Sequence, residues 1–332
     1  MLENQLSRYG SISKGIPEQI LAPGSKLFLV SDSDDTTVGP ANLGNEFPVD
    51  KDGVVRVYTT IQAAVNAASA GRGDVVLVTP GYDQSITAAD SWNIAGIQIL
   101  GMGNGNNRPT IRYTGASGEV GLGANNVRVS NLRFLAAADS IARAVDIDSG
   151  FSGIKFDNNV FDFNATTNDF RVMLRLGSAR SMVESNRFIA EDTAGAGKAI
   201  SIKGGAPSYS TIRNNFFYGQ FDTVGDTSNG AGVITQDTTD TADTNLSGLQ
   251  IANNVVINTD TAVPNYMRFS AGYRIRGIAN NNLFVGYDSA TADSTKFEYA
   301  TAANSGLRSS RNYTVGDSGT EKLIGDSFII NI

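Results

Sequence analysis

The stretch "VRVSNLRF", residues 127–134, recurs along the chain in altered form. The related stretches are "IKFDNNVF" (154–161), "TIRNNFF" (211–217) and "GIANNNLF" (277–284). Each places apolar residues in alternation, then Asn, then an aromatic residue. Alternation with a period of two is typical of β-strands, whose successive side chains point to opposite faces. We therefore expect Val127 and Val129 to face inward, Asn131 to turn a corner, and Phe134 to enter the core again.

The corner residue recurs at nearly constant spacing. Alignment three places before the aromatic residue or its equivalent gives Gly101, Asn131, Asn158, Ser185, Asn214, Asn253, Asn281 and Arg311. Subtraction of neighbouring numbers gives intervals of 30, 27, 27, 29, 39, 28 and 30 residues. A second pattern, apolar-x-apolar with Gly often close behind, precedes most corners by about ten residues: "EVGLGA", "AVDIDSG", "MLRLGS", "AISIKGG" and "MRFSAGY". A fixed period of this size is the signature of a stacked repeat.

Each repeat holds two or three short strands and no helix, which excludes helical solenoids. Propeller blades of about 40 residues are the competing repeat, but these units are too short for four strands. The spacing therefore predicts an all-β, single-stranded parallel β-helix with one repeat per coil. For the 39-residue interval we expect the surplus in a polar stretch, residues 225–245, looped out from the rod.

The repeated Asn has a mechanical explanation. Asn tolerates the left-handed backbone conformation that a sharp corner needs, and its amide can bond the equivalent Asn one coil away to form a ladder. The alternative is a polar ligand groove along exposed amides. The aromatic residues that follow the corner are expected to stack inside the rod: Phe134, Phe161, Phe188, Phe217 and Phe284.

Three segments flank or interrupt the predicted coils. Residues 1–25 are predicted to form an extended arm, residues 26–321 the β-helix, and residues 322–332 an apolar C-terminal segment. Thr59 and Gln62 have capping-box spacing, Gly71 is a C-terminal stop, and a helix over about 59–70 is predicted to cap the β-stack. Its apolar stripe consists of Ile61, Ala64, Val65 and Ala68.

Composition limits the possible chemistry. The chain has 332 residues with no Cys and no His, so thiolate sites, disulfides, His general bases and the Ser-His-Asp triad are excluded. The net charge of −7, without any Lys/Arg run, argues against nucleic acid as a main partner. The N-terminus lacks the apolar region of a signal peptide, and no apolar run approaches membrane-spanning length.

One outward-facing column could imitate a catalytic site. In "AVDIDSG", Val145 and Ile147 are expected to point inward, so Asp146 and Asp148 point outward. The equivalent positions on the next two coils are Arg175/Gly177 and Ser201/Lys203. Asp146, Arg175 and Asp148 together resemble a lyase site in which carboxylates hold calcium and Arg is the base. The competing interpretation, which we favour, is an Asp–Arg pair on a solvated sheet face. We therefore predict no catalytic, cofactor-binding or metal-binding residues.

The chain resembles the right-handed parallel β-helix, or pectin-lyase-like, superfamily. The resemblance covers about residues 54–314 and includes an entry segment, "TIQAAVNAASAGRGDVVLVTPGYDQSI" (60–86), with an amphipathic cap helix followed by "GD-strand-PG". A narrower resemblance, over about residues 24–140, is to β-helix proteins encoded beside the capsid genes of tailed bacteriophages. There "GIQILGMGNGNNRPTI" resembles the typical "GLGNG.NRPT", with Met102 in place of the usual Leu.

The resemblance implies a structural virion protein that decorates the capsid, binds the major capsid protein as a homotrimer, and uses no cofactor. Such a protein would be made in the host cytoplasm. The alternatives are a tailspike-type polysaccharide lyase or hydrolase, and a non-catalytic adhesin for a cell-surface glycan. A glycan-cleaving enzyme would show outward acid pairs or exposed aromatic residues along a groove. The only Trp, Trp92, is weak support for sugar stacking.

Overall fold

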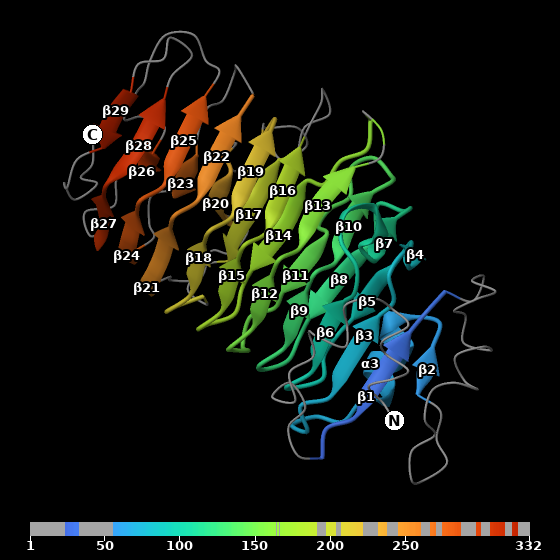
Figure 1. Cartoon of the computed structure of the whole chain (residues 1–332). Helices are drawn as coiled ribbons and strands as arrows, with labels where there is room; N and C mark the ends of the chain where they lie inside the picture. Colours follow the sequence, from blue (N-terminus) through green and yellow to red (C-terminus); the bar gives the residue numbers. More distant parts are fainter. Residues whose placement is uncertain are drawn as a thin grey trace.

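The computed structural model shows three parallel β-sheets wound along one axis, an all-β parallel β-solenoid (Figure 1). The structure describes residues 24–32, 56–163, 165, 167–190, 197–203, 207–221, 232–237, 245–259, 266–269, 274–286, 297–299, 306–315 and 321–324. The N-terminal arm (residues 1–25, of which only 24 and 25 are described) and the apolar residues 325–332 lie largely or wholly outside this part. The right-handed sense of the coil stays a prediction.

From β3 to β28, successive strands enter sheets A, B and C in turn. Sheet A has the order β2 (Val57–Tyr58), β1 (Leu27–Val30), β3 (Val75–Val78), β6 (Gln98–Gly101), β9 (Arg128–Ser130), β12 (Lys155–Asp157), β15 (Met182–Glu184), β18 (Thr211–Arg213), β21 (Asn245–Ala252), β24 (Arg274–Asn280) and β27 (Gly306–Ser310).

Sheet B has the order β29 (Glu321–Ile324), β28 (Asn312–Val315), β25 (Leu283–Gly286), β22 (Val255–Asn258), β19 (Phe216–Gly219), β16 (Arg187–Ala190), β13 (Val160–Phe163), β10 (Arg133–Ala136), β7 (Thr110–Tyr113) and β4 (Asp83–Ile86). Sheet C has the order β26 (Phe297–Tyr299), β23 (Met267–Phe269), β20 (Ile234–Asp237), β17 (Lys198–Lys203), β14 (Val172–Leu176), β11 (Val145–Ile147), β8 (Glu119–Leu122) and β5 (Ala89–Ser91). Among the described pairings only β28 with β29 is antiparallel.

The corner between sheets A and B is the predicted Asn column. Seven of its eight members have a left-handed backbone, with φ between 52° and 61°. The eighth, Gly101, instead lies where a Cβ would come within 2.2 Å of the carbonyl oxygen of Asn131. The prediction that these residues form left-handed corners is therefore confirmed.

The continuous amide ladder lies one residue after this column, which corrects the prediction. The corner Asn side chains are partly or largely exposed because a left-handed corner turns them outward, and Asn158 donates to Asn131 at 3.1 Å. The residue that follows each corner turns inward, and from the third coil onward it is a buried Asn. Each except the last donates Nδ2 to the next Oδ1 at 2.9–3.2 Å, in the order Asn159, Asn186, Asn215, Asn254, Asn282 and Asn312.

The interior is packed with apolar side chains from all three sheets. The five predicted aromatic residues are buried, and Phe134, Phe161, Phe188 and Phe217 form a continuous stack with ring centroids 4.8–5.1 Å apart. Val256 interrupts the column, and Phe284 stacks on Tyr266 instead, at 4.7 Å. Such ring pairs stabilise the rod beyond the area they bury.

The predicted helix is present but shorter than expected. It is α3 (Ile61–Ala67), its side chains Ile61, Ala64 and Val65 are buried, and it contacts β1, β2 and β3. Thr60, not Thr59, caps it: the Ala63 N–H donates to Thr60 Oγ1 at 3.2 Å. Gln62 instead exchanges hydrogen bonds with the Ser91 backbone, because the helix is anchored to strand β5. The helix ends at an extended Ala68, so Gly71 is not its stop.

The long polar interval is not a single excursion. Strand β20 lies inside the stretch 225–245 that was predicted to loop out, and it pairs in register with β17 through Ile200 and Ile234. The apolar Val233 and Ile234 are buried in the core. The segments on either side of β20, residues 222–231 and 238–244, lie outside the described residues.

Candidate functional surface

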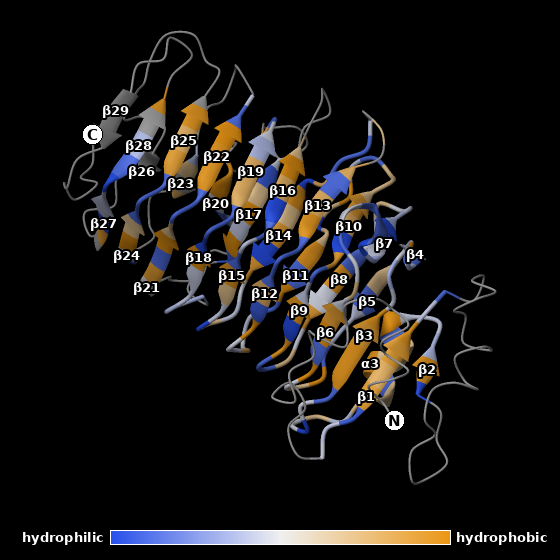
Figure 2. Ribbon diagram, in the orientation of Figure 1, coloured by the Kyte–Doolittle hydropathy of each residue, from blue (hydrophilic) through white to orange (hydrophobic). Residues whose placement is uncertain are grey.

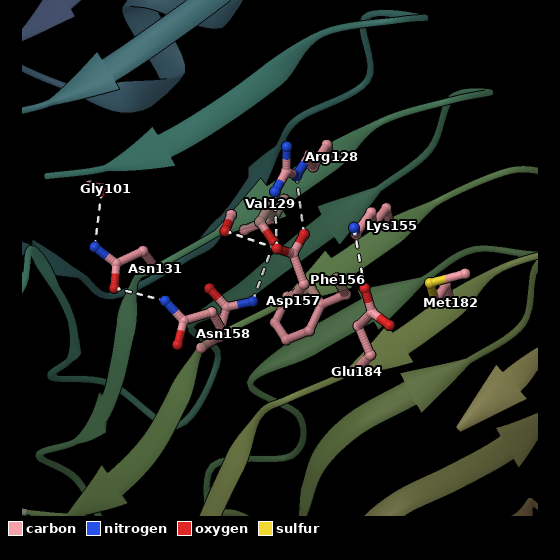
Figure 3. A network of polar contacts seen from close by, with 12 residues as sticks. Gly101, Arg128, Val129, Asn131, Lys155, Phe156, Asp157, Asn158, Met182 and Glu184 are labelled. Carbon is pink, nitrogen blue, oxygen red and sulfur yellow. Dashed lines mark hydrogen bonds and ion pairs between the residues drawn. The ribbon is translucent and has the colours of Figure 1, made fainter. Parts of the chain in front are cut away.

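The outward face of sheet A carries charged side chains that pair between coils. Arg128 donates from Nε and Nη2 to the two carboxylate oxygens of Asp157, both at 2.9 Å, and Ser130 donates to the same carboxylate at 3.0 Å. Lys155 and Arg213 lie at 3.0 and 2.7 Å from Glu184. Figure 3 shows Arg128 directed at Asp157 and Lys155 at Glu184, beside the corner formed by Asn131 and Asn158.

These contacts keep Glu184 ionised. Burial alone would raise the pKa of the Glu184 carboxyl, but the hydrogen bonds and charges of Lys155 and Arg213 outweigh burial and hold that pKa below its usual range. A carboxylate held in this way is a poor proton donor near neutral pH, because a general acid needs a pKa near the working pH.

The sheet C column holds the residues that sequence analysis singled out. Val145 and Ile147 are buried, and Asp146, Arg175 and Ser201 are aligned on neighbouring coils, as predicted. Arg175 forms a two-pronged ion pair with Asp146, with Nε···Oδ1 at 2.7 Å and a second bond through Nη2.

The second carboxylate of the imagined lyase site does not join this pair. Asp148 lies beyond the end of β11 and is exposed, and its Oδ1 accepts from the Ser149 N–H at 3.1 Å. Position 177 is Gly because a Cβ there would lie 2.5 Å from the Ile147 carbonyl oxygen. The structure therefore brings together Asp146 and Arg175 as a cross-coil pair, and leaves Asp148 apart from it.

The outward face of sheet B has two different halves. On β4 to β13 it is polar, with ion pairs from Arg112 to Asp83 and from Arg133 to Asp162. On β16 to β28 every outward position except Arg187 is apolar. We call these nine side chains the apolar face: Ile189, Phe216, Tyr218, Val255, Ile257, Leu283, Val285, Tyr313 and Val315.

Sequence reasoning missed the apolar face, although its signal was present. A half-buried strand alternates apolar and polar residues, whereas "FFYG", "VVIN" and "LFVG" are apolar on both sides of the buried residue, and "RFIA" is apolar on one side. Figure 2 shows this change along the stack, with hydrophobic colour over β22 and β25. Leu283 and Tyr313 are 36% and 46% exposed.

The aromatic side chains that could stack on a sugar differ in their exposure. Trp92 is fully buried, so its ring cannot stack on a ligand. Phe216 and Tyr218 are half-buried on the surface of β19 with their rings nearly parallel, and the Arg187 guanidinium lies 5.8 Å from the Phe216 ring centroid.

In the part of the chain that the structure describes, no three Asp or Glu side chains gather in a way that could hold a metal ion. Within the same residues, no helix has the length and hydropathy to cross a membrane.

No known protein family matches the chain, and no curated protein matches it. Among solved structures, it is similar to a mutant tailspike protein of E. coli bacteriophage HK620 in complex with a pentasaccharide, with 13% identity and a TM-score of 0.39. That match covers 82% of this chain and 60% of the tailspike chain. A second similar structure is ORF18 of Geobacillus virus E2, with 12% identity, a TM-score of 0.28, and coverage of 77% and 57%. The chain thus spans less than two thirds of either structure, and the likeness concerns the fold alone.

Proposed function

We propose that the chain is a structural protein of a tailed-bacteriophage virion, a rigid β-solenoid that acts by binding rather than by turnover. The observation that carries this proposal is the state of the outward carboxylates on the sheets. Six of them lie in ion pairs with an Arg of an adjacent coil: Asp83, Glu119, Asp146, Asp157, Asp162 and Glu184.

Ion pairing matters because glycoside hydrolysis needs two carboxyl groups in different states. One must be protonated to act as an acid, and the other must be free to act as a nucleophile or base. Carboxylates held by guanidinium groups are not free to attack. The same pairs link neighbouring coils and suit a scaffold.

The site on the virion is a finer proposal. Capsid decoration is supported by the resemblance of residues 24–140 to β-helix proteins encoded beside capsid genes. As a decoration protein, the chain would bind the major capsid protein as a homotrimer on the outer surface of the head.

The alternative, a polysaccharide lyase or hydrolase of tailspike type, is favoured by a different observation. The aromatic side chains Phe216 and Tyr218 on the surface, together with exposed Tyr209 and Tyr313, offer rings against which a sugar could pack. A non-catalytic adhesin would use the same rings. The Asp146–Arg175 pair adds no support for cleavage, because both groups already satisfy each other.

The deciding experiment locates the chain and measures turnover. Mass spectrometry of purified virions, followed by gold labelling of the chain in electron micrographs, should place it on the head for decoration and on the tail for a spike. Absence from virions would overturn the proposal. Incubation with host polysaccharides, with and without calcium, should release no products; steady product release would replace a binding role by an enzymatic one.

A further inference from the structure

The apolar face raises the question of what covers it. Its nine side chains occupy two adjacent outward columns on five consecutive strands of sheet B. Strands in a sheet lie about 4.8 Å apart, so the face extends roughly 20 Å along the solenoid axis. With a width of two outward side chains it covers on the order of 300 Å², the size at which exposed apolar patches on a monomer are often functional.

We infer that the apolar face is the surface through which this chain associates with other copies of itself. This inference deepens the proposed function and rests on it, because a protein that acts by binding alone gains affinity when several linked copies engage one particle. The shape, the charge and the area of the apolar face all bear on which partner covers it.

The shape of the face selects a flat partner. Outward side chains of a pleated sheet pack best against another sheet face about 10 Å away. Among the described residues, the outward faces of sheets A and C are dominated by ion pairs, such as Arg128–Asp157 and Arg175–Asp146. Among the described sheet faces, only the apolar face of sheet B is itself apolar. The matching partner is therefore the same face of a second copy.

Charge favours contact at this place. The whole chain carries a net charge of −7, so two copies repel one another at long range. No carboxylate lies within the nine positions of the apolar face. At one end the flanking acid, Asp162 on β13, is already paired with Arg133, and at the other end Glu321 of β29 lies opposite Val315. Two copies that meet over β16 to β25, away from Glu321, therefore bury no unpaired negative charge, which would be costly.

The apolar face is smaller than a complete interface between two proteins. A stable interface buries about 800 Å² per partner, with an apolar core inside a polar rim. The apolar face, on the order of 300 Å², can form the core of such an interface, and polar residues around it must supply the rest of the area. The neighbouring Arg187 and the Arg133–Asp162 pair are placed to form one side of it.

The test compares lysine substitutions inside the apolar face with a lysine substitution outside it. Leu283 on β25 lies in the apolar face, whereas Ile278 on β24 faces outward from sheet A and is 43% exposed. Leu283→Lys, combined with Val255→Lys, should weaken self-association about tenfold or more, measured by sedimentation and light scattering over a range of concentrations. Ile278→Lys should behave as the wild type. A wild-type chain that stays monomeric at every concentration overturns the inference, as does an oligomer unaffected by the two lysines.

A second measurement covers the case in which the lysine variant fails to fold. The natural chain has no Cys, so single-Cys variants form disulfides only where two copies meet. Leu283→Cys and Tyr313→Cys should give dimers on non-reducing gels under mild oxidation, whereas Ile278→Cys should not. Equal cross-linking at all three positions contradicts the inference.

The outcomes separate this inference from the proposed function. A monomer that is found on virions keeps the virion role and removes the interface. An oligomer that is absent from virions keeps the interface and removes the virion role.

Discussion

The side-chain amide of Asn186 donates to the side-chain oxygen of Asn215 on the next coil, with Nδ2···Oδ1 at 3.0 Å, and both residues are buried. The same oxygen also accepts the backbone N–H of Asn186 at 3.0 Å. The other Nδ2 hydrogen of Asn186 goes to the carbonyl oxygen of Phe156 on the preceding coil. One Asn thus satisfies polar groups of the coils on both sides, as a buried polar group requires.

Removal of one ladder member should therefore cost more than removal of one hydrogen bond. Asn215→Ala leaves the Asn186 amide, the Val183 carbonyl and the Asn254 side-chain oxygen short of a partner. Since each unsatisfied buried group costs about 1–3 kcal/mol, we expect a loss of roughly 3–5 kcal/mol in the free energy of unfolding, measured in urea.

The neighbouring residue provides the control for this variant. Asn214 is exposed and has a φ of 56°, so Asn214→Gly keeps the corner and should change stability by less than about 1 kcal/mol. Equal losses of unfolding free energy in the two variants would show that the buried Asn ladder stabilises the protein no more than the exposed corner residues do.

The corner itself predicts a ranking of substitutions at Ser185. Its φ of 57° is left-handed, a conformation that Asn and Gly adopt at low cost. Ser185→Asn should leave the melting temperature equal or higher, whereas Ser185→Val should lower stability by about 1–2 kcal/mol, because a β-branched side chain clashes there. Thermal unfolding followed by circular dichroism checks the order; a stable Val variant would contradict it.

The Asp146–Arg175 pair should behave as a structural element. The two side chains are 8% and 14% exposed. Removal of one partner from a buried pair costs about 3–5 kcal/mol, whereas replacement of both by apolar residues is often neutral. Arg175→Met should thus lower the urea midpoint, and Asp146→Leu added to it should restore most of the loss. A double variant no better than the single one would speak against simple pairing.

Stability should also depend on pH through Asp74. Burial alone would raise the pKa of the Asp74 carboxyl, but hydrogen bonds from the Arg72 guanidinium and from the N–H groups of Ser69 and Lys26 outweigh burial and lower it. A lowered folded-state pKa stabilises the protein above the unfolded value of about 3.9, and this contribution is lost as pH falls toward the folded value.

Melting curves at neutral and acidic pH test this prediction. Asp74→Asn should be less stable than the wild type at neutral pH, and the difference should shrink as pH falls below about 4. Asp83→Asn, at an exposed carboxylate on β4, is the control and should show a smaller effect, because exposed ion pairs contribute about 0–1 kcal/mol. A difference for Asp74→Asn that persists at low pH would contradict the assignment.

The sequence by itself determined the architecture, because the quantities that define a solenoid are local and repeated. The 27–30-residue interval, the period-two alternation and the Asn corners each depend on a few neighbouring residues, and the corner at Asn131 and the stacked ring of Phe161 are found where they were expected. The helix position was predicted for the same reason. Its cap was shifted by one residue, because Gln62 bonds Ser91 on a distant strand.

Only the tertiary structure decided which Asn column forms the ladder, where the long interval returns to the sheet, and what the outer faces look like. Asn158 and Asn159 are adjacent and identical, and only the left-handed corner directs one to the surface and the other into the core. Strand β20 is recognisable only through its pairing with β17. The ion pair of Asp146 with Arg175 joins residues 29 positions apart on neighbouring coils, and the apolar face of sheet B likewise gathers residues from different coils. Side-chain neighbours across coils depend on register, which a single repeat does not contain.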